Sequence, residues 1–194
     1  DKKGKVEIPK GIYSLTQTLR IYEGTTLIID DQAVLRWDGN PSSQPMFLNG
    51  QKGNKDYARG YNGDSNINVI GGTIDLNGTN NPPSNPTGYG PVAFGIGHAQ
   101  DIRFYGVTMT NGDNNHYVEL RGVKRWSVIG CKFIDMIYTG DRMYEAIQVD
   151  LQSDQGFPHF GTADNTPSMK GIVSGFTFDP LPYGVGSNGM RLTP

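Results

Sequence analysis

The fold is decided by the stretch Ile102-Arg-Phe-Tyr-Gly-Val-Thr-Met109, which aligns without gaps with three other segments of the chain. These are Ile67-Asn-Val-Ile-Gly-Gly-Thr-Ile74, Trp126-Ser-Val-Ile-Gly-Cys-Lys-Phe133 and Gly171-Ile-Val-Ser-Gly-Phe-Thr-Phe178. In each segment the apolar residues alternate, skip one place at a shared glycine, and alternate again. Alternation is the period of a β-strand, and glycine tolerates a bend with positive φ. Each segment therefore predicts two short strands joined by a bend.

The alignment also predicts the core, because residues in one column repeat from segment to segment. The apolar columns are Val69/Phe104/Val128/Val173, Gly72/Val107/Cys131/Phe176, Ile74/Met109/Phe133/Phe178 and, more weakly, Ile67/Ile102/Trp126/Gly171, with a glycine column at Gly71/Gly106/Gly130/Gly175. We expect Cys131 to be a core residue.

A third strand precedes each of the later segments, in the pairs Phe94 and Ile96, Val118 and Leu120, and Ile147 and Val149. The aligned segments start at residues 67, 102, 126 and 171, so the shortest repeat is about 24 residues and the others carry insertions. Such a repeat is typical of a right-handed parallel β-helix, whereas a propeller needs a steadier period and a leucine-rich repeat needs its Leu/Asn consensus. The sequence predicts an all-β chain, a single-stranded right-handed parallel β-helix with three short strands per coil.

We expect one domain over residues 1–194, with N-terminal coils in 1–65 and regular coils with loop insertions in 66–194. No amphipathic capping helix follows the last predicted coil, and uncovered strand edges invite pairing with other chains. The expectation is therefore a piece of a longer β-helix that continues beyond residue 194.

Composition excludes several classes of protein. The 27 glycines and 12 prolines argue against a helical bundle. The 17 basic and 19 acidic residues give a net charge of -2, which leaves no basic field for nucleic acid. One cysteine allows neither an internal disulfide nor a multi-cysteine metal site. No run of 18 apolar residues appears, so no membrane partner is expected.

The third strand carries the candidate site. Its outward positions form the ladders Gly95/Glu119/Gln148, Gly97/Arg121/Asp150 and Ala93/Tyr117/Ala146, and His116 registers with Glu145 at the rim. Residues one coil apart stack about 4.8 Å from each other, so small residues in one coil would leave room beside polar residues in the next. This arrangement predicts a carbohydrate groove.

Two carboxylates beside an imidazole can act as acid and base in glycosidic or phosphodiester cleavage. The predicted catalytic residues are Glu119 and Asp150, with His116 and Glu145 as rim partners, and the predicted substrate contacts are Arg121, Gln148 and Tyr117. Each has a plainer interpretation: a surface ion pair for Arg121 and Asp150, a solvated ladder for Glu119 and Gln148, a strand cap for His116, and a turn anchor for Glu145. No cofactor is expected. Ca²⁺ held by carboxylates is a secondary option, which no Asp-x-Asp-x-Asp-Gly loop supports.

Long polar loops enter and leave this strand, in residues 75–92, 110–115, 134–144 and 151–168. Insertions of this length are uncommon unless they are functional, so we expect them to wall one face. Phe157, His159 and Phe160 could there offer rings to sugar faces, although His98 and His159 have structural roles as their plainer interpretation.

Three N-terminal motifs resemble the start of pectate-lyase-like β-helix proteins: Ile8-Pro-Lys-Gly-Ile-Tyr13, Thr25-Thr-Leu-Ile-Ile-Asp30 and Asn68-Val-Ile-Gly-Gly-Thr-Ile-Asp75. His116-Tyr-Val-Glu-Leu120 and Glu145-Ala-Ile-Gln-Val-Asp150 resemble a subset found in tail spikes and tail fibres of bacteriophages that infect Gram-positive bacteria. The resemblance implies a location on a virion tail, a homotrimer, and a host cell-wall glycan as partner. It says little about activity, because one scaffold hosts many activities.

Three functions follow as hypotheses. The first is a tail module that binds and cleaves a host glycan, either teichoic acid or a polysaccharide, through the carboxylates. The second is a non-catalytic receptor-binding or structural tail module. The third is a bacterial enzyme similar to pectate lyase or polygalacturonase. The calcium-binding aspartates of the lyases and the Asp-Asp and Gly-His-Gly motifs of polygalacturonases are missing from the matching strands, which counts against the third hypothesis.

Overall fold

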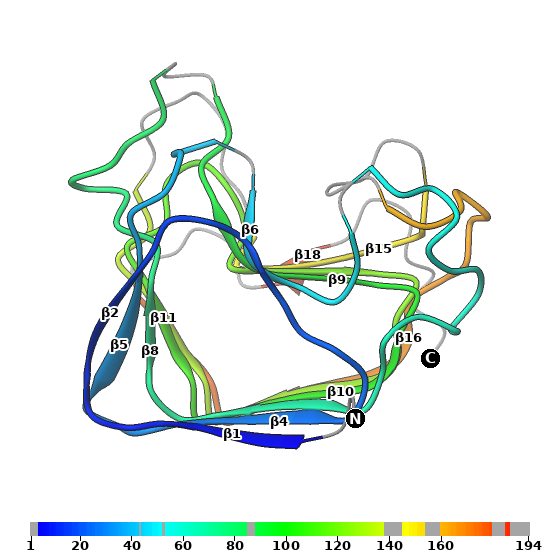
Figure 1. The fold of residues 1–194 in the computed structure, drawn as a ribbon, viewed down its shortest axis with the longest axis horizontal. Helices are drawn as coiled ribbons and strands as arrows, with labels where there is room; N and C mark the ends of the chain where they lie inside the picture. Colours follow the sequence, from blue (N-terminus) through cyan, green and yellow to red (C-terminus); the bar gives the residue numbers. More distant parts are fainter. Residues whose placement is uncertain are drawn as a thin grey trace.

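The computed structural model describes residues 4–42, 44–51, 53–84, 88–137, 145–153, 160–179 and 185–186. These residues form eighteen β-strands in three parallel sheets, and each sheet has six strands. The chain winds as a right-handed parallel β-helix with three strands per coil, as the repeat predicts (Figure 1). Among the described residues, no helix is long and apolar enough to cross a bilayer.

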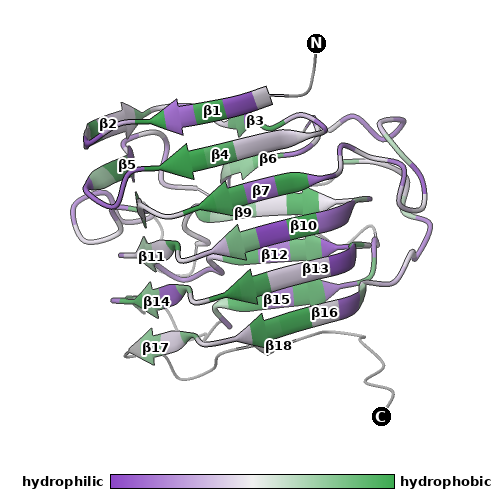
Figure 2. Ribbon diagram, turned by 90° about the horizontal axis from the view of Figure 1, so that it is seen from below, coloured by the Kyte–Doolittle hydropathy of each residue, from purple (hydrophilic) through white to green (hydrophobic). Residues whose placement is uncertain are grey.

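Every coil contributes one strand to each sheet. Sheet A contains β1 (Gly4–Ile8), β4 (Thr25–Ile29), β7 (Ile67–Ile70), β10 (Gln100–Tyr105), β13 (Lys124–Ile129) and β16 (Met169–Ser174). Sheet B contains β2 (Gly11–Leu15), β5 (Ala33–Trp37), β8 (Thr73–Asp75), β11 (Thr108–Thr110), β14 (Lys132–Ile134) and β17 (Thr177–Asp179). Sheet C contains β3 (Leu19–Arg20), β6 (Pro45–Leu48), β9 (Val92–Gly97), β12 (Val118–Arg121), β15 (Ile147–Asp150) and β18 (Val185–Gly186). Figure 2 shows sheet A as a stack of rungs, with β1 and β16 at opposite ends.

The observed register confirms the ungapped alignment. In sheet A, Phe104 pairs with Val69 on one side and with Val128 on the other. In sheet B, Met109 lies between Ile74 and Phe133 in the same way. The repeat in the sequence is therefore the hydrogen-bonding register of the coils.

The inward columns make one core that runs along the helix axis. Aromatic rings stack from coil to coil within it: the ring centroids of Phe47 and Phe94 are 5.0 Å apart, and those of Phe133 and Phe178 are 5.2 Å apart. Cys131 is fully buried, as predicted, and burial raises the pKa of its thiol. Phe176 is an exception to its predicted apolar column, because it is 44% exposed.

The bend between sheets A and B depends on glycine. Gly71, Gly106, Gly130 and Gly175 all have φ between 61° and 71°, the left-handed region that other residues rarely adopt. This confirms the predicted role of the glycine column. The bend is so short that sheets A and B meet at a tight corner, and long insertions occur only before and after sheet C.

Loops from those two corners rise on the outer side of sheet C (Figure 1). One group follows sheet B and includes described residues near 38–42, 76–84 and 111–117. The other group follows sheet C and includes residues 49–51, 53–66 and 160–168. The expected walls are therefore present at both ends of the sheet C strands, within the described residues.

Candidate functional site

The predicted polar ladders lie on the outer face of sheet C. Glu119 of β12 pairs with Gln148 of β15, and Arg121 pairs with Asp150. On the other side of β12, Glu119 and Arg121 pair with Gly95 and Gly97 of β9. Strand alternation therefore brings the four polar side chains together, as the sequence predicts.

This polar cluster is buried, whereas the sequence predicts an open groove at this place. The exposed fractions are 3% for Glu119, 8% for Arg121, 3% for Gln148 and 7% for Asp150. Arg121 Nε donates to Glu119 Oε1 over 2.5 Å, and Arg121 Nη2 donates to Asp150 Oδ2 over 3.2 Å. One guanidinium thus contacts both buried carboxylates. A buried charge without such a partner is very costly.

Two amide oxygens beside this cluster receive no hydrogen bond from the described residues. They are Oε1 of Gln148 and Oε1 of Gln152, and both side chains are at least nine-tenths buried. Gln152 is held in place, because its Nε2 donates to the Phe160 carbonyl over 2.8 Å. Each such oxygen costs about 1–3 kcal/mol unless a donor reaches it. The face therefore holds two fixed acceptors that lack a donor among the described residues and that are closed to solvent.

His116 and Glu145 meet at the rim of the same face, as predicted. His116 Nδ1 lies 2.7 Å from the Glu145 carbonyl oxygen and 3.7 Å from Glu145 Oε2. Burial lowers the pKa of the His116 imidazole below its usual value near 6.5, although the carbonyl and the carboxylate of Glu145 act in the opposite direction. The ring is therefore neutral at pH 7, and a neutral imidazole can accept a proton.

The lowered pKa of His116 predicts how stability depends on pH. The unfolded chain takes up a proton at His116 near pH 6.5, whereas the native ring resists protonation, so the free energy of unfolding falls as the pH drops below about 6.5. One proton limits this slope to about 1.4 kcal/mol per pH unit. Urea unfolding between pH 7.5 and pH 5 should show a smaller pH dependence for His116→Gln than for the parent chain. Equal slopes would contradict the prediction, since the other titrating groups are common to both proteins.

Tyr117 is a correction, because the structure does not place it outward. It is fully buried and belongs to the core with Ala93 and Ala146, the other two members of its predicted ladder. Its hydroxyl donates to the Ile134 carbonyl over 2.6 Å. The reason is local: the amides of Tyr117 and Val118 both donate to the Ala146 carbonyl, so strand alternation is broken just before β12 begins. Tyr117 cannot contact a substrate from this position.

Phe160 is a second correction. It was expected on the loop wall as a stacking surface for sugars, but it is buried against sheet C. A Cβ added at Gly50 would lie 2.4 Å from its ring, and one at Gly97 would lie 2.7 Å from it. Its ring also packs edge-on against Tyr57, with centroids 5.5 Å apart. Phe160 therefore occupies the space that the small residues were predicted to leave for a ligand.

Of the remaining candidate histidines and loop aromatics, one lies within the described residues and two lie outside them. His98 is structural, as its plainer interpretation has it: it is buried, and its Nδ1 lies 2.8 Å from the Gly60 carbonyl oxygen. Phe157 and His159 lie outside the described residues. In the part of the chain that is described, no three His, Cys, Asp or Glu side chains group as metal ligands.

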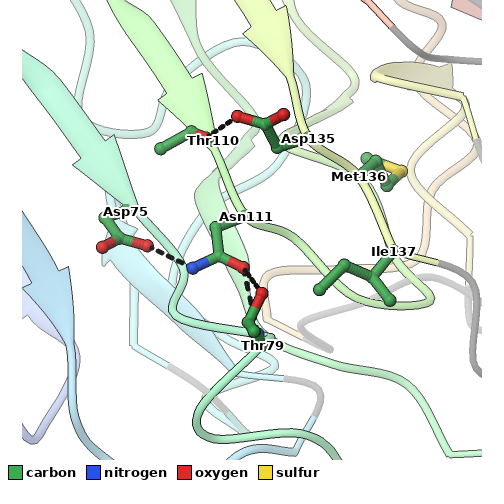
Figure 3. A pocket seen from close by; sticks show the side chains of 7 residues that line it. All are labelled: Asp75, Thr79, Thr110, Asn111, Asp135, Met136 and Ile137. Carbon is green, nitrogen blue, oxygen red and sulfur yellow. Dashed lines mark hydrogen bonds between the residues drawn. The ribbon is translucent and has the colours of Figure 1, made fainter.

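A separate pocket of about 520 Å³ opens where sheet B ends, and the sequence analysis missed it. Figure 3 shows Asn111 between Asp75 and Thr79, with Met136 and Ile137 beyond it. The residues that line it are Asp75, Thr79, Thr110, Asn111, Asp135, Met136 and Ile137. Its polar residues lie just beyond the aligned segments: Asp75 is one residue past its segment, and Asn111 and Asp135 are two residues past theirs.

Hydrogen bonds fix the polar side chains of this pocket. Asn111 Nδ2 donates to Asp75 Oδ1 over 3.1 Å, and Thr79 Oγ1 donates to Asn111 Oδ1 over 2.7 Å. Thr110 Oγ1 donates to Asp135 Oδ2 over 3.1 Å. Asn111 and Asp135 have φ of 59° and 55°, so both turn the chain sharply at the end of their strands.

Comparison with known proteins supports the fold. No family model and no curated protein matches the sequence. Two structures of PfbA, a surface adhesin of Streptococcus pneumoniae, are similar, with TM-scores of 0.82 and 0.78 and identities of 20% and 21%. Each match covers 97% of this chain, which spans 46% and 49% of the two adhesin chains.

A candidate glycosyl hydrolase from Parabacteroides merdae has a TM-score of 0.55 and 16% identity, over 91% of this chain and 83% of that one. At these identities, the likeness to the adhesin and to the hydrolase shows a shared β-helix fold and nothing further.

Proposed function

We propose that this chain is a surface-displayed β-helix module that recognises a glycan on the outer face of sheet C. The observation that carries the proposal is the pair of buried acceptors without a donor among the described residues, Gln148 Oε1 and Gln152 Oε1, beside a fixed Arg121 ion pair. A glycan would reach these oxygens once the residues that cover sheet C, Phe160 among them, move aside. Sugars present many hydroxyl donors, and a polar face of amides and carboxylates at fixed spacing is suited to them. The named neighbours, a surface adhesin and a candidate glycosyl hydrolase, are compatible with this role.

The contacts of Glu119 and Asp150 favour recognition of a glycan over its cleavage. Arg121 already contacts both predicted catalytic carboxylates, Glu119 through Nε and Asp150 through Nη2, so neither can approach a scissile bond without breaking this ion pair. A binding module on a cell or virion surface therefore fits the geometry better than a depolymerase. The phage tail assignment, the trimer and the choice of teichoic acid stay predictions.

Cleavage is kept as a second candidate because of His116. A neutral imidazole 3.7 Å from the Glu145 carboxylate is a general-base arrangement, and it lies at the rim, where a polymer would enter. In this mechanism, Glu119 and Asp150 orient the substrate through Arg121, and His116, assisted by Glu145, transfers the proton.

Gln148→Met tests the proposal, because binding and stability should respond in opposite directions. The change keeps the side-chain length and removes the unpaired oxygen, so the free energy of unfolding should be at least that of the parent. Affinity for the recognised glycan should fall at least tenfold. Immobilised capsular polysaccharide and teichoic acid serve as probes, with bound protein measured by interferometry and released fragments by size-exclusion chromatography.

Gln32→Met, at an exposed turn, is the matched control and should change neither quantity. Full binding by Gln148→Met would exclude this face as the recognition site. Fragment release that disappears in His116→Gln but persists in Gln32→Met would establish cleavage.

A further inference from the structure

We infer that the pocket lined by Asp75, Asn111 and Asp135 is a subsite for an uncharged sugar unit, which makes the recognised glycan neutral rather than polyanionic. This inference rests on the proposed function, because it takes a glycan as the ligand. It goes further by adding a second contact point, away from the Glu119–Arg121–Asp150 cluster, and by naming the ligand class.

The pocket offers acceptors whose positions are already fixed. The bonds from Asn111 Nδ2 and from the Asn77 amide both go to Asp75 Oδ1, and the bond from Thr110 goes to Asp135 Oδ2. The second oxygen of each carboxylate takes no hydrogen bond from the described residues. These two oxygens can each accept a hydroxyl proton, and the side chains lose little freedom when they do so.

The apolar part of the lining suits the other surface of a sugar. Met136 is buried with its side chain at the pocket, and Ile137 is half-buried beside it. Figure 3 shows both on the side of Asn111 opposite Asp75. A pocket with polar groups on one side and apolar groups on the other receives a ring that has hydroxyls at its edge and C–H bonds on its face. Its volume of about 520 Å³ lies within the usual range for small-molecule sites.

Charge decides which sugars can enter. Among the described residues, the lining contains two carboxylates and neither lysine nor arginine. Nearby, Asn77 Nδ2 donates to Asp38 Oδ1, and Arg36 is already paired with that same Asp38. The phosphates of teichoic acid or the carboxylates of a uronate polymer would therefore be repelled.

The sheet C cluster does not reverse this preference, because Arg121 is compensated by two carboxylates. His116, at the rim of sheet C, follows Asn111 by five residues, so at most roughly 18 Å of chain separates the pocket from this rim. One neutral polymer could contact both.

The test is isotope-edited NMR of the intact chain with defined probes. The neutral probes are tetrasaccharides of glucose, galactose, mannose and N-acetylglucosamine, and the acidic probes are tetragalacturonate and poly(glycerol phosphate). We expect at least one neutral probe to shift the amide signals of Thr79, Asn111 and Met136, and neither acidic probe to do so. Asp75→Asn/Asp135→Asn should bind that probe at least tenfold more weakly.

Asp31→Asn is the matched control, since its exposed carboxylate lies in the turn before β5, at the opposite end of sheet B. It should bind as the parent does. If the parent binds a glycan that the double pocket variant binds equally well, the subsite is wrong and the proposed function stands. If only acidic probes bind, the charge argument is wrong. If EDTA abolishes the shifts, a cation site replaces the sugar subsite. If no glycan binds at all, the proposed function itself fails.

Discussion

Replacing Arg121 with methionine should lower the free energy of unfolding by about 3–5 kcal/mol. Arg121 donates to both Glu119 and Asp150, and all three side chains are at least nine-tenths buried. Methionine keeps the aliphatic length but removes the cation that both buried carboxylates contact. Equilibrium unfolding in urea, monitored by circular dichroism, measures the loss.

Arg125→Met is the matched control for this experiment. Arg125 also pairs with an aspartate, Asp101, but 43% of its side chain is exposed on the outer side of sheet A. Exposed pairs of this kind contribute about 0–1 kcal/mol. Equal losses in the two variants would mean that the Arg121 cluster is solvated, and would remove the burial on which the binding argument depends.

A compensated variant separates charge from packing. In Arg121→Met/Glu119→Gln/Asp150→Asn, no buried charge is left without a partner, although the shapes stay similar. We expect this triple variant to be more stable than Arg121→Met alone. If it is less stable, the loss in the single variant comes from lost contacts of the arginine stem rather than from stranded charge.

The strand register could be predicted because every coil must bury apolar residues at the same positions. Each coil needs an apolar residue under the same position of the coil before it, so Val69, Phe104 and Val128 occupy one column in the sequence and in space. The glycine column could be read for the same reason, since the four aligned corners between sheets A and B all have a positive φ. The pairing of Arg121 with Asp150 follows from the separate repeat of sheet C, in which Val118 pairs with Phe94 and Ile147.

The incorrect predictions concern residues at which a local irregularity of the chain interrupts the repeat. Tyr117 turns inward because two successive amides share the Ala146 carbonyl, a detail that alternation cannot reveal. Phe160 covers Gly97 although the two residues are far apart in sequence and belong to different coils, and no repeat links them. Burial of Glu119 and Asp150 depends on such loop contacts, so the sequence could predict which side chains meet but not whether solvent reaches them.

Phe160→Ala should lower the free energy of unfolding by about 3–5 kcal/mol, as for a large aromatic ring removed from a packed site. The ring fills the space above Gly50 and Gly97 and packs on Tyr57, so its loss leaves a cavity on the outer face of sheet C. Phe176→Ala is the matched control: this phenylalanine is 44% exposed, and its loss should cost far less.

Gly97→Ala tests the same contact from the other side. In the parent chain the new methyl group would lie 2.7 Å from Phe160 Cζ, an overlap that costs about 1–3 kcal/mol. Without the Phe160 ring, the nearest remaining atom is Gln152 Oε1 at 3.2 Å, so Gly97→Ala should cost less in the Phe160→Ala background. Two independent losses in this double-mutant cycle would mean that the ring does not lie over Gly97.

Loss of the Phe160 ring should also expose the candidate site. The ring belongs to the segment 160–168, which covers the outer face of sheet C. Gln152 N donates to the Thr166 carbonyl, and Asn165 N donates to the Gln152 carbonyl, so backbone bonds join the segment to the chain just after β15. Amide hydrogen exchange at Gln152 and Asn165 should therefore be faster in Phe160→Ala, while exchange at Phe104 in sheet A should be nearly unchanged. Uniform acceleration across all three sheets would show that the ring stabilises the whole helix rather than closing this face, and the loops would then have no part in admitting a ligand.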